Sequence, residues 1–321
     1  MTGFIVSQYG PPTVLKITRI STPLLSPKEV LIKVAASGLN PLDYKVRRGD
    51  LKKIVRLSFP KVIGSDVAGT VVGVGSQVTN FQPNDEVYAM SPTPRFGGYG
   101  EYLAINAKHV AKKPTNLSFE EAAAIPIAGL TAWQALRKKA TISPNSRVLI
   151  NGASGGVGTF AVQIAKAAGA HVTGVCSAQN LALVKELGAT NAIDYKLQDF
   201  TQMPHQYDVI FDTVGNRSFL ECKPALAKKG VYITTEVSPQ AFFHSVLSFV
   251  GGKKSKIIMV KSDREDLYQL AQYAEASMLK PVIQKVYDAT EKDMVEAHQQ
   301  LETGHTVGKL VMQLNFSDTP Q

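Results

Sequence analysis

Residues 147–169 read RVLINGASGGVGTFAVQIAKAAG and hold three structural signals in succession. RVLIN is a short apolar run typical of a buried strand, GASGGVG is a glycine-rich turn, and TFAVQIAKAAG is typical of a helix that ends at a glycine. Ala153, Gly155 and Gly158 match the spacing of the dinucleotide-binding fingerprint, with alanine in place of its first glycine. The stretch therefore predicts a turn that binds phosphate at the N-terminus of a helix.

The sequence after this turn alternates strand and helix patterns. Further strand candidates are HVTGVC (171–176), NAID (191–194), DVIFDTV (208–214), VYITTE (231–236) and KIIMV (256–260). Their spacing fits a strand, a helix and two loops, which is the rhythm of βαβ units. With RVLIN they predict an α/β, doubly wound Rossmann domain with a parallel six-stranded sheet.

A second motif overlaps the same turn. Residues 152–156 also satisfy G-x-S-x-G, the nucleophile elbow of α/β-hydrolases, with Ser154 as the nucleophile. Asp212 and several histidines farther along the chain could complete a catalytic triad. A hydrolase elbow does not require Gly158, however, and it normally follows several strand–helix units of its own sheet. The dinucleotide interpretation is therefore favoured.

The sequence before residue 118 has a different pattern. Short β-branched runs such as EVLIKVAASG (29–38) and GEYLAINAKHV (100–110) are separated by glycine and proline. This pattern predicts a small antiparallel β domain. Ser118 and Glu121 have the spacing of a capping box, which predicts that a helical stretch begins there.

The final residues change pattern again. A helix is expected over 265–278, with Ser262 and Glu265 as its capping pair, and another after Thr290. The sequence GKLVMQL (308–314) predicts a last strand.

Composition limits the class of protein. A chain of 321 residues with 44% hydrophobic and 19% charged residues fits about two globular domains. Two cysteines do not make a disulfide framework, and no stretch reaches the roughly 18 apolar residues of a membrane span. The start, MTGFIVSQYG, lacks the features of a signal peptide, so a soluble cytoplasmic protein is expected. The net charge of +9 suggests an anionic partner, but the basic residues are scattered, and nucleic acid is not favoured.

The end of the second strand bears on the choice of cofactor. An acidic residue there would bind the ribose 2′-hydroxyl of NAD, but this segment reads CSAQN (176–180). Without a carboxylate to repel a 2′-phosphate, and with Ser177 as a donor, NADPH is favoured. No arginine or lysine stands in this segment; Lys196, beside Tyr195, is one possible source of positive charge.

Several motifs together carry a family resemblance over essentially the whole chain. They include NPLDYKVRRG (40–49), VIGSDVAGTVVGVG (62–75), AAAIPIAGLTAWQAL (122–136), ELGATNAIDY (186–195) and HTVGKLVM (305–312). With the glycine-rich turn they resemble the medium-chain dehydrogenase/reductase superfamily. Within it the chain is similar to the zinc-independent quinone oxidoreductase branch, close to the plant enone and alkenal reductases and the chloroplast-envelope quinone-oxidoreductase homologue.

The resemblance implies two domains and the absence of zinc. A GroES-like, mostly antiparallel β domain would comprise residues 1–118 and 279–321, with the NADP(H)-binding Rossmann domain, residues 119–278, inserted in it. The place of the zinc-binding His-Glu pair reads Gly64-Ser65-Asp66, and the early cysteine place falls near Gly38 to Asn40. Without these soft ligands no catalytic metal is expected.

The resemblance also implies a set of site residues. Lys45 would bind the acceptor oxygen or the cofactor, and Asn40 and Tyr44 would line the same cleft; an exposed lysine beside Arg47 and Arg48 is the alternative for Lys45. The residues that the resemblance places at the cofactor are Lys45, Thr131, Ser154, Gly155, Gly156, Val157, Ser177, Tyr195, Gly215 and Lys309.

Three functions remain open from the sequence. The favoured one is hydride transfer from NADPH to a small electrophile, either a quinone or the C=C bond of an α,β-unsaturated ketone or aldehyde. An enoyl-thioester reductase, with Tyr44 as proton donor, is the second. A non-enzymatic NADPH-binding protein that acts as a sensor or binds a membrane surface or RNA is the third. The family also implies a homodimer, and peripheral contact with a membrane stays open.

Overall fold

The computed structural model describes residues 1–248 and 252–316, and its contacts group the chain into two compact units. The first unit contains residues 1–130, 261–277 and those from 281 on; the second contains residues 131–260 and 278–280. The contacts thus assign residues 119–130 and 261–277 to the first unit, whereas the sequence places both in the inserted domain. The domain limits drawn from the sequence stay a prediction.

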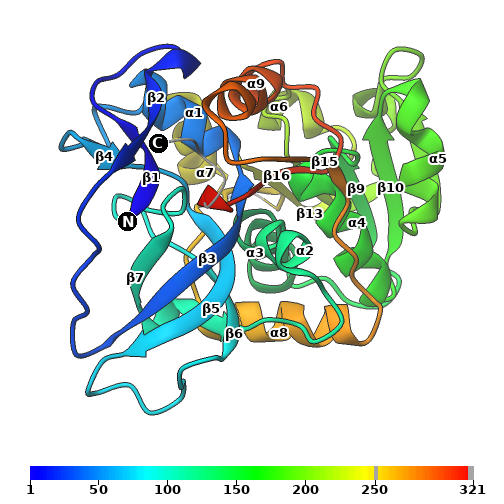
Figure 1. Cartoon of the computed structure of the whole chain (residues 1–321). Helices are drawn as coiled ribbons and strands as arrows, with labels where there is room; N and C mark the ends of the chain where they lie inside the picture. The colour runs from blue at the N-terminus through cyan, green and yellow to red at the C-terminus, as the bar shows by residue number, and fades with distance from the viewer. Residues whose placement is uncertain (249–251, 317–321) are drawn as a thin grey trace. The chain divides into compact units, whose positions relative to one another are not determined.

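The second unit is built on a parallel six-stranded sheet with the order β11-β10-β9-β12-β13-β14 among the described residues (Figure 1). The strands are β9 (Arg147–Asn151), β10 (His171–Cys176), β11 (Asn191–Asp194), β12 (Tyr207–Asp212), β13 (Leu226–Thr234) and β14 (Lys254–Ile257). The chain order runs outward from β9 in one direction and then from β12 in the other. This reversal creates a crevice at the carboxyl ends of β9 and β12, where open α/β sheets bind ligands.

Helices connect these strands. The α-helices are α4 (Gly156–Ala167), α5 (Leu181–Glu186), α6 (Phe219–Cys222) and α7 (Pro239–Leu247). A π-helical segment, η3 (Gln134–Ala140), and two short 3-10 turns, η4 (Ala178–Asn180) and η5 (Phe200–Gln202), complete the unit. Buried side chains from β9, β10, β12 and β13, among them Leu149, Val175, Ile210 and Tyr232, form its core.

The first unit contains two sheets. A small sheet has the order β2-β1-β4, and a larger one has the order β15-β16-β3-β5-β6-β8, with β7 paired to β3. Its strands are β1 (Thr2–Val6), β2 (Leu15–Arg19), β3 (Glu29–Leu39), β4 (Lys61–Val62), β5 (Asp66–Val74), β6 (Glu86–Met90), β7 (Tyr102–Asn106), β8 (Val110–Lys112), β15 (Ile283–Tyr287) and β16 (Lys309–Gln313). Because β16 pairs antiparallel with β3, the last strand completes a sheet that the first residues began.

The first unit also contains several helices. They are α1 (Pro41–Arg48), α2 (Phe119–Ala123), α3 (Pro126–Trp133, of which residues 126–130 belong to this unit), α8 (Arg264–Glu275) and α9 (Glu291–Glu302), with the 3-10 turns η1 (Pro12–Val14) and η2 (Ala107–His109). Ser118 caps α2 in the expected capping box, and Thr290 caps α9. The expected helix after residue 262 is present as α8, but the predicted capping pair of Ser262 and Glu265 was wrong. Asp263 caps α8, because its carboxylate accepts from the backbone N–H groups of Glu265 and Asp266, while Ser262 donates to the Met90 carbonyl.

The fold class predicted from the sequence is confirmed. The three strands nearest the glycine-rich turn, β9, β10 and β11, have the predicted limits, whereas β13 begins earlier than expected and β14 is displaced toward the N-terminus. No helix within the described ranges is long and apolar enough to cross a membrane.

Candidate active site and cofactor site

The turn between β9 and α4 has no room for side chains at two of its glycines. Gly152 has a φ of +82°, and a Cβ there would lie 2.6 Å from Thr213 Oγ1. A Cβ on Gly158 would lie 2.0 Å from the Gly152 carbonyl oxygen, so only glycine lets the helix pack this closely on the turn. A Cβ on Gly155 would meet only that oxygen, at 3.4 Å. Gly155 therefore borders open space, as a backbone that a pyrophosphate approaches requires.

The start of α4 offers hydrogen-bond donors to such a group. Gly155 is the N-cap residue, and no side chain caps the helix. The first N–H groups of an α-helix, here those of Gly156 and Val157, have no partner within the helix, and the helix dipole is positive at this end. The turn therefore fits a phosphate-bearing cofactor on its own geometry.

Asp212, at the end of β12, organises the loop beside this turn. Its buried carboxylate accepts from the Asn151 side chain (2.9 Å), from the backbone N–H groups of Val214 (3.1 Å) and Gly215 (3.0 Å), and from the Tyr232 hydroxyl (3.1 Å). These contacts join the ends of β9, β12 and β13 and fix the loop at Gly215, one of the expected cofactor residues. The sequence considered Asp212 only as a triad acid, but its oxygens are committed to the loop.

Ser154 and Ser177 lie together at the ends of β9 and β10. The Asn180 side chain donates to Ser154 Oγ (3.1 Å) and to Ser177 Oγ (3.2 Å), which links the turn to the segment after β10. Tyr195 follows β11 at the same edge, since its N–H donates to the Cys176 carbonyl, and its side chain is half exposed. Ser177 and Tyr195 thus lie at the same edge of the sheet as the glycine-rich turn.

In the first unit a buried polar network surrounds Asn40, the N-cap residue of α1. The Asn40 side chain donates to Asp66 Oδ2 (3.0 Å), and its backbone N–H donates to Asp43 Oδ2 (2.8 Å). Lys309 Nζ donates to the Leu39 carbonyl (2.9 Å) and to Asn40 Oδ1 (2.5 Å) and lies 3.7 Å from Asp66 Oδ2. Four side chains from β16, β5 and the start of α1 thereby fix one turn of the backbone.

Two more hydrogen bonds extend this network. The Tyr99 hydroxyl donates to Asp43 Oδ2 (2.8 Å), and the Ile127 N–H donates to Asp66 Oδ1 (2.9 Å). Burial, with the negative charge of Asp66 acting in the same direction, raises the pKa of Asp43 to about 7. Burial also raises the pKa of Asp66, to about 6, against the lowering effect of Lys309. The pKa of Lys309 is lowered by burial and raised in part by the two carboxylates.

The structure places the remaining expected residues of the first unit on α1. Lys45 is partly exposed, and no hydrogen bond or ion pair of its side chain is found in the part of the chain that the structure describes. Tyr44 is half-buried, and the Arg48 guanidinium lies 5.9 Å from the centre of its ring. Burial raises the pKa of Tyr44, against the lowering effect of Arg48. Lys45 is therefore available to a ligand, whereas Lys309, the other lysine expected at the site, is buried and bound.

Of the expected cofactor residues, eight lie in the second unit: Thr131, Ser154, Gly155, Gly156, Val157, Ser177, Tyr195 and Gly215. Asn40, Tyr44, Lys45 and Lys309 lie in the first unit. Thr131 is buried in α3. Sequence reasoning missed Asp43 and Asp66 as partners of Asn40, and Tyr99 as a partner of Asp43. The capping spacing of Asn40 and Asp43 was the one local signal that pointed to any of them.

Metal-binding side chains do not gather in the described residues, where no group of three or more His, Cys, Asp and Glu side chains could hold an ion. At the place where zinc-binding members of the superfamily have a His-Glu pair, Ser65 is buried and Asp66 pairs with Lys309. The cation beside this carboxylate is therefore an ammonium group.

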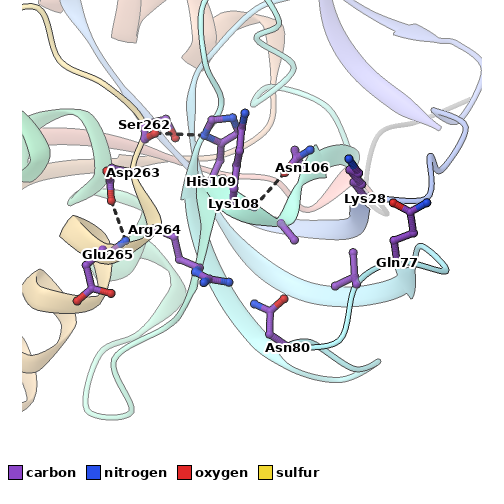
Figure 2. Close-up of a pocket in the computed structure, with 12 residues that line it drawn as sticks. Lys28, Gln77, Asn80, Asn106, Lys108, His109, Ser262, Asp263, Arg264 and Glu265 are labelled. Carbon is purple, nitrogen blue, oxygen red and sulfur yellow. Dashed lines mark hydrogen bonds between the residues drawn. The ribbon is translucent and has the colours of Figure 1, made fainter.

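The first unit also has an open polar pocket of about 660 Å³ near the start of α8. Figure 2 shows its mixed lining, in which Arg264 lies beside Asp263 and Glu265, and Lys28 lies on the other side of the pocket near Gln77. His109 contacts the Ser262 carbonyl at 3.2 Å, and the Asp263 carboxylate already caps the helix. None of the expected site residues borders this pocket.

A smaller pocket of about 300 Å³ lies in the second unit beside the loop that Asp212 fixes. Gly215, Asn216, Thr234 and Glu236 border it on the side of the strand ends, and His244 of α7 also lines it. It extends the space at the carboxyl end of the sheet toward α6 and α7.

Two family models match the chain. The model described as an alcohol dehydrogenase GroES-like domain matches residues 26–115, and the model described as a zinc-binding dehydrogenase matches residues 187–312. The first match contains β3 to β8, and the second runs from the residue after α5 into β16.

Known proteins resemble the chain over nearly its whole length. The 2-methylene-furan-3-one reductase of Solanum lycopersicum is 38% identical over 97% of this chain and 79% of its own length. The NADPH-dependent alkenal/one oxidoreductase, chloroplastic, of Arabidopsis thaliana is 36% identical over 97% of this chain and 79% of its own length. The structure of the quinone oxidoreductase from Coxiella burnetii has a TM-score of 0.88 and 32% identity, and covers 98% of this chain and 99% of that one.

Proposed function

The chain belongs to the quinone oxidoreductase branch of the medium-chain dehydrogenase/reductase superfamily, and we propose that it transfers hydride from NADPH to quinones or to the C=C bond of α,β-unsaturated ketones and aldehydes. It is an oxidoreductase that uses a nicotinamide cofactor. The cofactor supplies the hydride, and the protein must align the acceptor with it and stabilise the oxygen on which negative charge develops.

The glycine-rich turn carries the proposal. Gly155 leaves its side of the turn open, and the uncapped start of α4 presents N–H groups to a pyrophosphate. The loop at Gly215, fixed by Asp212, would hold the ribose on the nicotinamide side. Ser177 and Tyr195 would meet the adenosine 2′-phosphate and ring. The preference for NADPH over NADH is supported by Ser177 and by the absence of a carboxylate from residues 177–180.

Lys45 is the residue we propose to bind the acceptor oxygen. Its ammonium group is partly exposed and has no partner among the described side chains, so it is free to donate a hydrogen bond. Tyr44 would line the same site. Asn40, Asp66 and Lys309 act as positioning residues, because they hold the turn from which α1, and with it Lys45, begins. No step requires a metal ion.

A panel of quinones and enones assayed with NADPH and NADH in parallel tests the function. We expect oxidation of NADPH with at least one acceptor, such as 9,10-phenanthrenequinone or a short vinyl ketone, and slower turnover with NADH. Failure of every acceptor with both cofactors would contradict the proposal. Faster turnover with NADH would contradict the role given to Ser177 alone.

The variant Lys45→Met, compared with Lys45→Arg, tests the role of the ammonium group. We expect Lys45→Met to lower kcat/KM by about tenfold or more while leaving the Kd for NADPH within a factor of a few, because a lost hydrogen bond to a charged oxygen is worth about 1.5–3 kcal/mol. Lys45→Arg keeps the charge and should recover part of the rate. Equal rates for the three proteins would show that Lys45 is an ordinary surface lysine.

The domain limits and the oligomeric state belong to the same proposal. We propose that residues 119–278 form the inserted cofactor domain and that two copies of the chain associate. Light scattering on the purified protein, with and without NADPH, gives the mass directly. A monomer under both conditions would contradict the dimer.

A further inference from the structure

Helix α1 has a buried side and an opposite side that carries Lys45. Asp43, Val46 and Arg47 are buried. With about 3.6 residues per turn, Lys45 lies on the side of the helix opposite to these three residues. The direction in which Lys45 extends from the first unit is therefore set by the contacts that hold the buried side of α1.

The helix is too short to keep its place without such contacts. It contains eight residues, Pro41–Arg48, and helices of this length are marginal in water unless the rest of the protein holds them. Val46 contributes an apolar contact, but Asp43 and Arg47 bring ionisable groups to the buried side. The network around Asn40 fixes the N-terminal end of α1, and Arg47 lies one turn farther along the same side.

The Arg47 guanidinium is held from two directions. Its side chain is fully buried. Nη1 donates to the Gly10 carbonyl (3.0 Å), and Nη2 donates to the Glu302 carboxylate of α9. The Gly10 N–H donates in turn to the Arg47 carbonyl (3.1 Å). Because an arginine is almost never buried this fully unless it is paired, the position of Arg47 depends on these partners.

Helix α9 also reaches the other end of the same side. His298 lies one turn before Glu302 in α9, on the same face. Its ring packs edge-on against the Tyr99 ring, with 5.9 Å between the ring centres, and the Tyr99 hydroxyl donates to Asp43 Oδ2 at 2.8 Å. The two helices lie side by side in the first unit (Figure 1). α9 is thus connected to α1 directly at Arg47 and through Tyr99 at Asp43.

We propose that Arg47 and Glu302 are positioning residues for the reaction, which act on it by fixing the direction of Lys45. The inference rests on the proposed role of Lys45 at the acceptor oxygen. A hydrogen-bond donor helps catalysis only when it is held where charge develops, and a displacement of about 1 Å can cost on the order of a hundredfold in rate. A buried ion pair adds little net stability, which fits a role in specifying one position of α1.

A neighbouring ion pair on α9 provides a matched control. The Glu296 carboxylate pairs with Lys285 of β15 at 2.5 Å, and both side chains are about half exposed. Glu296→Gln therefore removes the same charge from the same helix as Glu302→Gln does. Arg47→Lys is a second test variant, because it keeps the positive charge but has one ammonium group in place of the two Nη atoms that bind Gly10 and Glu302.

Hydrogen–deuterium exchange tests the anchoring of α1 without any turnover. We expect Glu302→Gln to speed the exchange of the amides of residues 43–48 by about tenfold or more, because α1 then opens more often. Glu296→Gln should leave this exchange unchanged. Normal exchange of α1 in Glu302→Gln overturns the proposal, whatever acceptor the enzyme reduces.

Kinetics show whether the anchoring acts through Lys45. We expect Glu302→Gln and Arg47→Lys each to lower kcat/KM by about tenfold, and Glu296→Gln to leave it unchanged. In a Lys45→Met background the same two substitutions should change kcat/KM by less than about twofold, because the group that they position is absent. The Kd for NADPH should stay within a factor of a few, since most of the expected cofactor residues lie in the second unit.

The contrary outcomes are distinct. Effects of Glu302→Gln and Lys45→Met that multiply in full would show that Glu302 supports the fold and not Lys45, and would overturn the proposal. An equal loss of kcat/KM in Glu296→Gln would do the same. Thermal unfolding shows that each variant is folded, and Glu302→Gln decides alone if Arg47→Lys is not.

The proposed function can fail separately. If the unchanged chain reduces no acceptor, that function is contradicted, and the consequence of Arg47 and Glu302 for catalysis falls with it. The exchange measurement still decides whether Glu302 anchors α1.

Discussion

At the scale of single residues, the first unit buries ionisable side chains, which protein cores ordinarily exclude. Asp43, Asp66 and Lys309 are all nearly or completely buried, and each has a hydrogen bond to Asn40. A buried ion pair adds little net stability, but removing one partner leaves the other charge without compensation. The network therefore specifies one conformation of the turn before α1.

Lys309→Met tests this dependence. Because it leaves the Asp66 carboxylate buried without its cation, we expect the free energy of unfolding to fall by about 3 kcal/mol or more at neutral pH. Urea denaturation measures the change. Combining it with Asp66→Asn removes the stranded charge and should recover part of the loss. If the double variant is no more stable than Lys309→Met, the two residues are not coupled as described.

Asp43 should make stability depend on pH. Its folded pKa, raised to about 7, lies above the value of an unfolded aspartate, so the folded state binds the proton more tightly. This contribution is fully present at low pH and is lost as the pH rises through about 7. Asp43→Asn should therefore flatten the pH dependence of the unfolding free energy between about pH 4 and pH 7. An unchanged slope across this range would contradict the raised pKa.

The effect of His298 on the pH dependence of stability should be opposite to that of Asp43. Burial, with the Arg47 charge acting in the same direction, lowers the pKa of His298 to about 3, and both ring nitrogens lack a hydrogen-bond partner among the described residues. An unfolded histidine binds a proton near pH 6.5, so stability is lost as the pH falls below about 6. His298→Leu should remove this loss and improve stability at about pH 5 relative to the unchanged chain, which urea denaturation at several pH values can measure. An equally steep loss in the variant would exclude His298 as its source.

At the scale of elements, the segment β9–turn–α4 was predictable from its own residues. The apolar run, the glycine spacing and the glycine after the helix are all local signals, and Gly158 proved to have the steric reason that the fingerprint implies. The network around Asn40 was not predictable in this way. It joins residues 26 positions apart (Asn40 and Asp66) and 269 apart (Asn40 and Lys309), and no local pattern encodes that they meet.

Helix α7 shows a second limit of sequence patterns. Ser238 caps it and Pro239 begins it, which are ordinary start signals, yet its apolar residues face solvent. Apolar periodicity alone indicates that a helix has an apolar face and does not say what covers that face. The prediction that Ser262 caps α8 was wrong for a similar reason, because Asp263 beside it is an equally good cap.

Two glycines of the turn should respond differently to alanine. Gly158→Ala places a Cβ against the Gly152 carbonyl and should lower the thermal midpoint markedly, whereas Gly155→Ala has an ordinary contact and should leave the fold nearly as stable. Both should weaken NADPH binding, and Gly155→Ala should do so by about tenfold or more without unfolding. Differential scanning calorimetry gives the thermal midpoint, and isothermal titration calorimetry gives the Kd for NADPH. Normal NADPH affinity in Gly155→Ala would contradict the close approach of a pyrophosphate.

At the scale of the whole molecule, the two units differ in which parts of the chain form their sheets. The sheet of the second unit is formed by strands that follow one another between residues 147 and 257. The large sheet of the first unit needs β16, which pairs with β3 from the beginning of the chain.

This arrangement has a consequence for protein synthesis. While a ribosome is still extending the chain, Asp66 exists without its cation, because Lys309 is added only after the whole second unit has been made. The first unit then has to keep a carboxylate hydrated that its finished core buries. In nascent chains stalled after the second unit but before β16, residues 1–130 should therefore stay sensitive to protease until Lys309 emerges. Any NADPH binding by such stalled chains should come from the second unit alone.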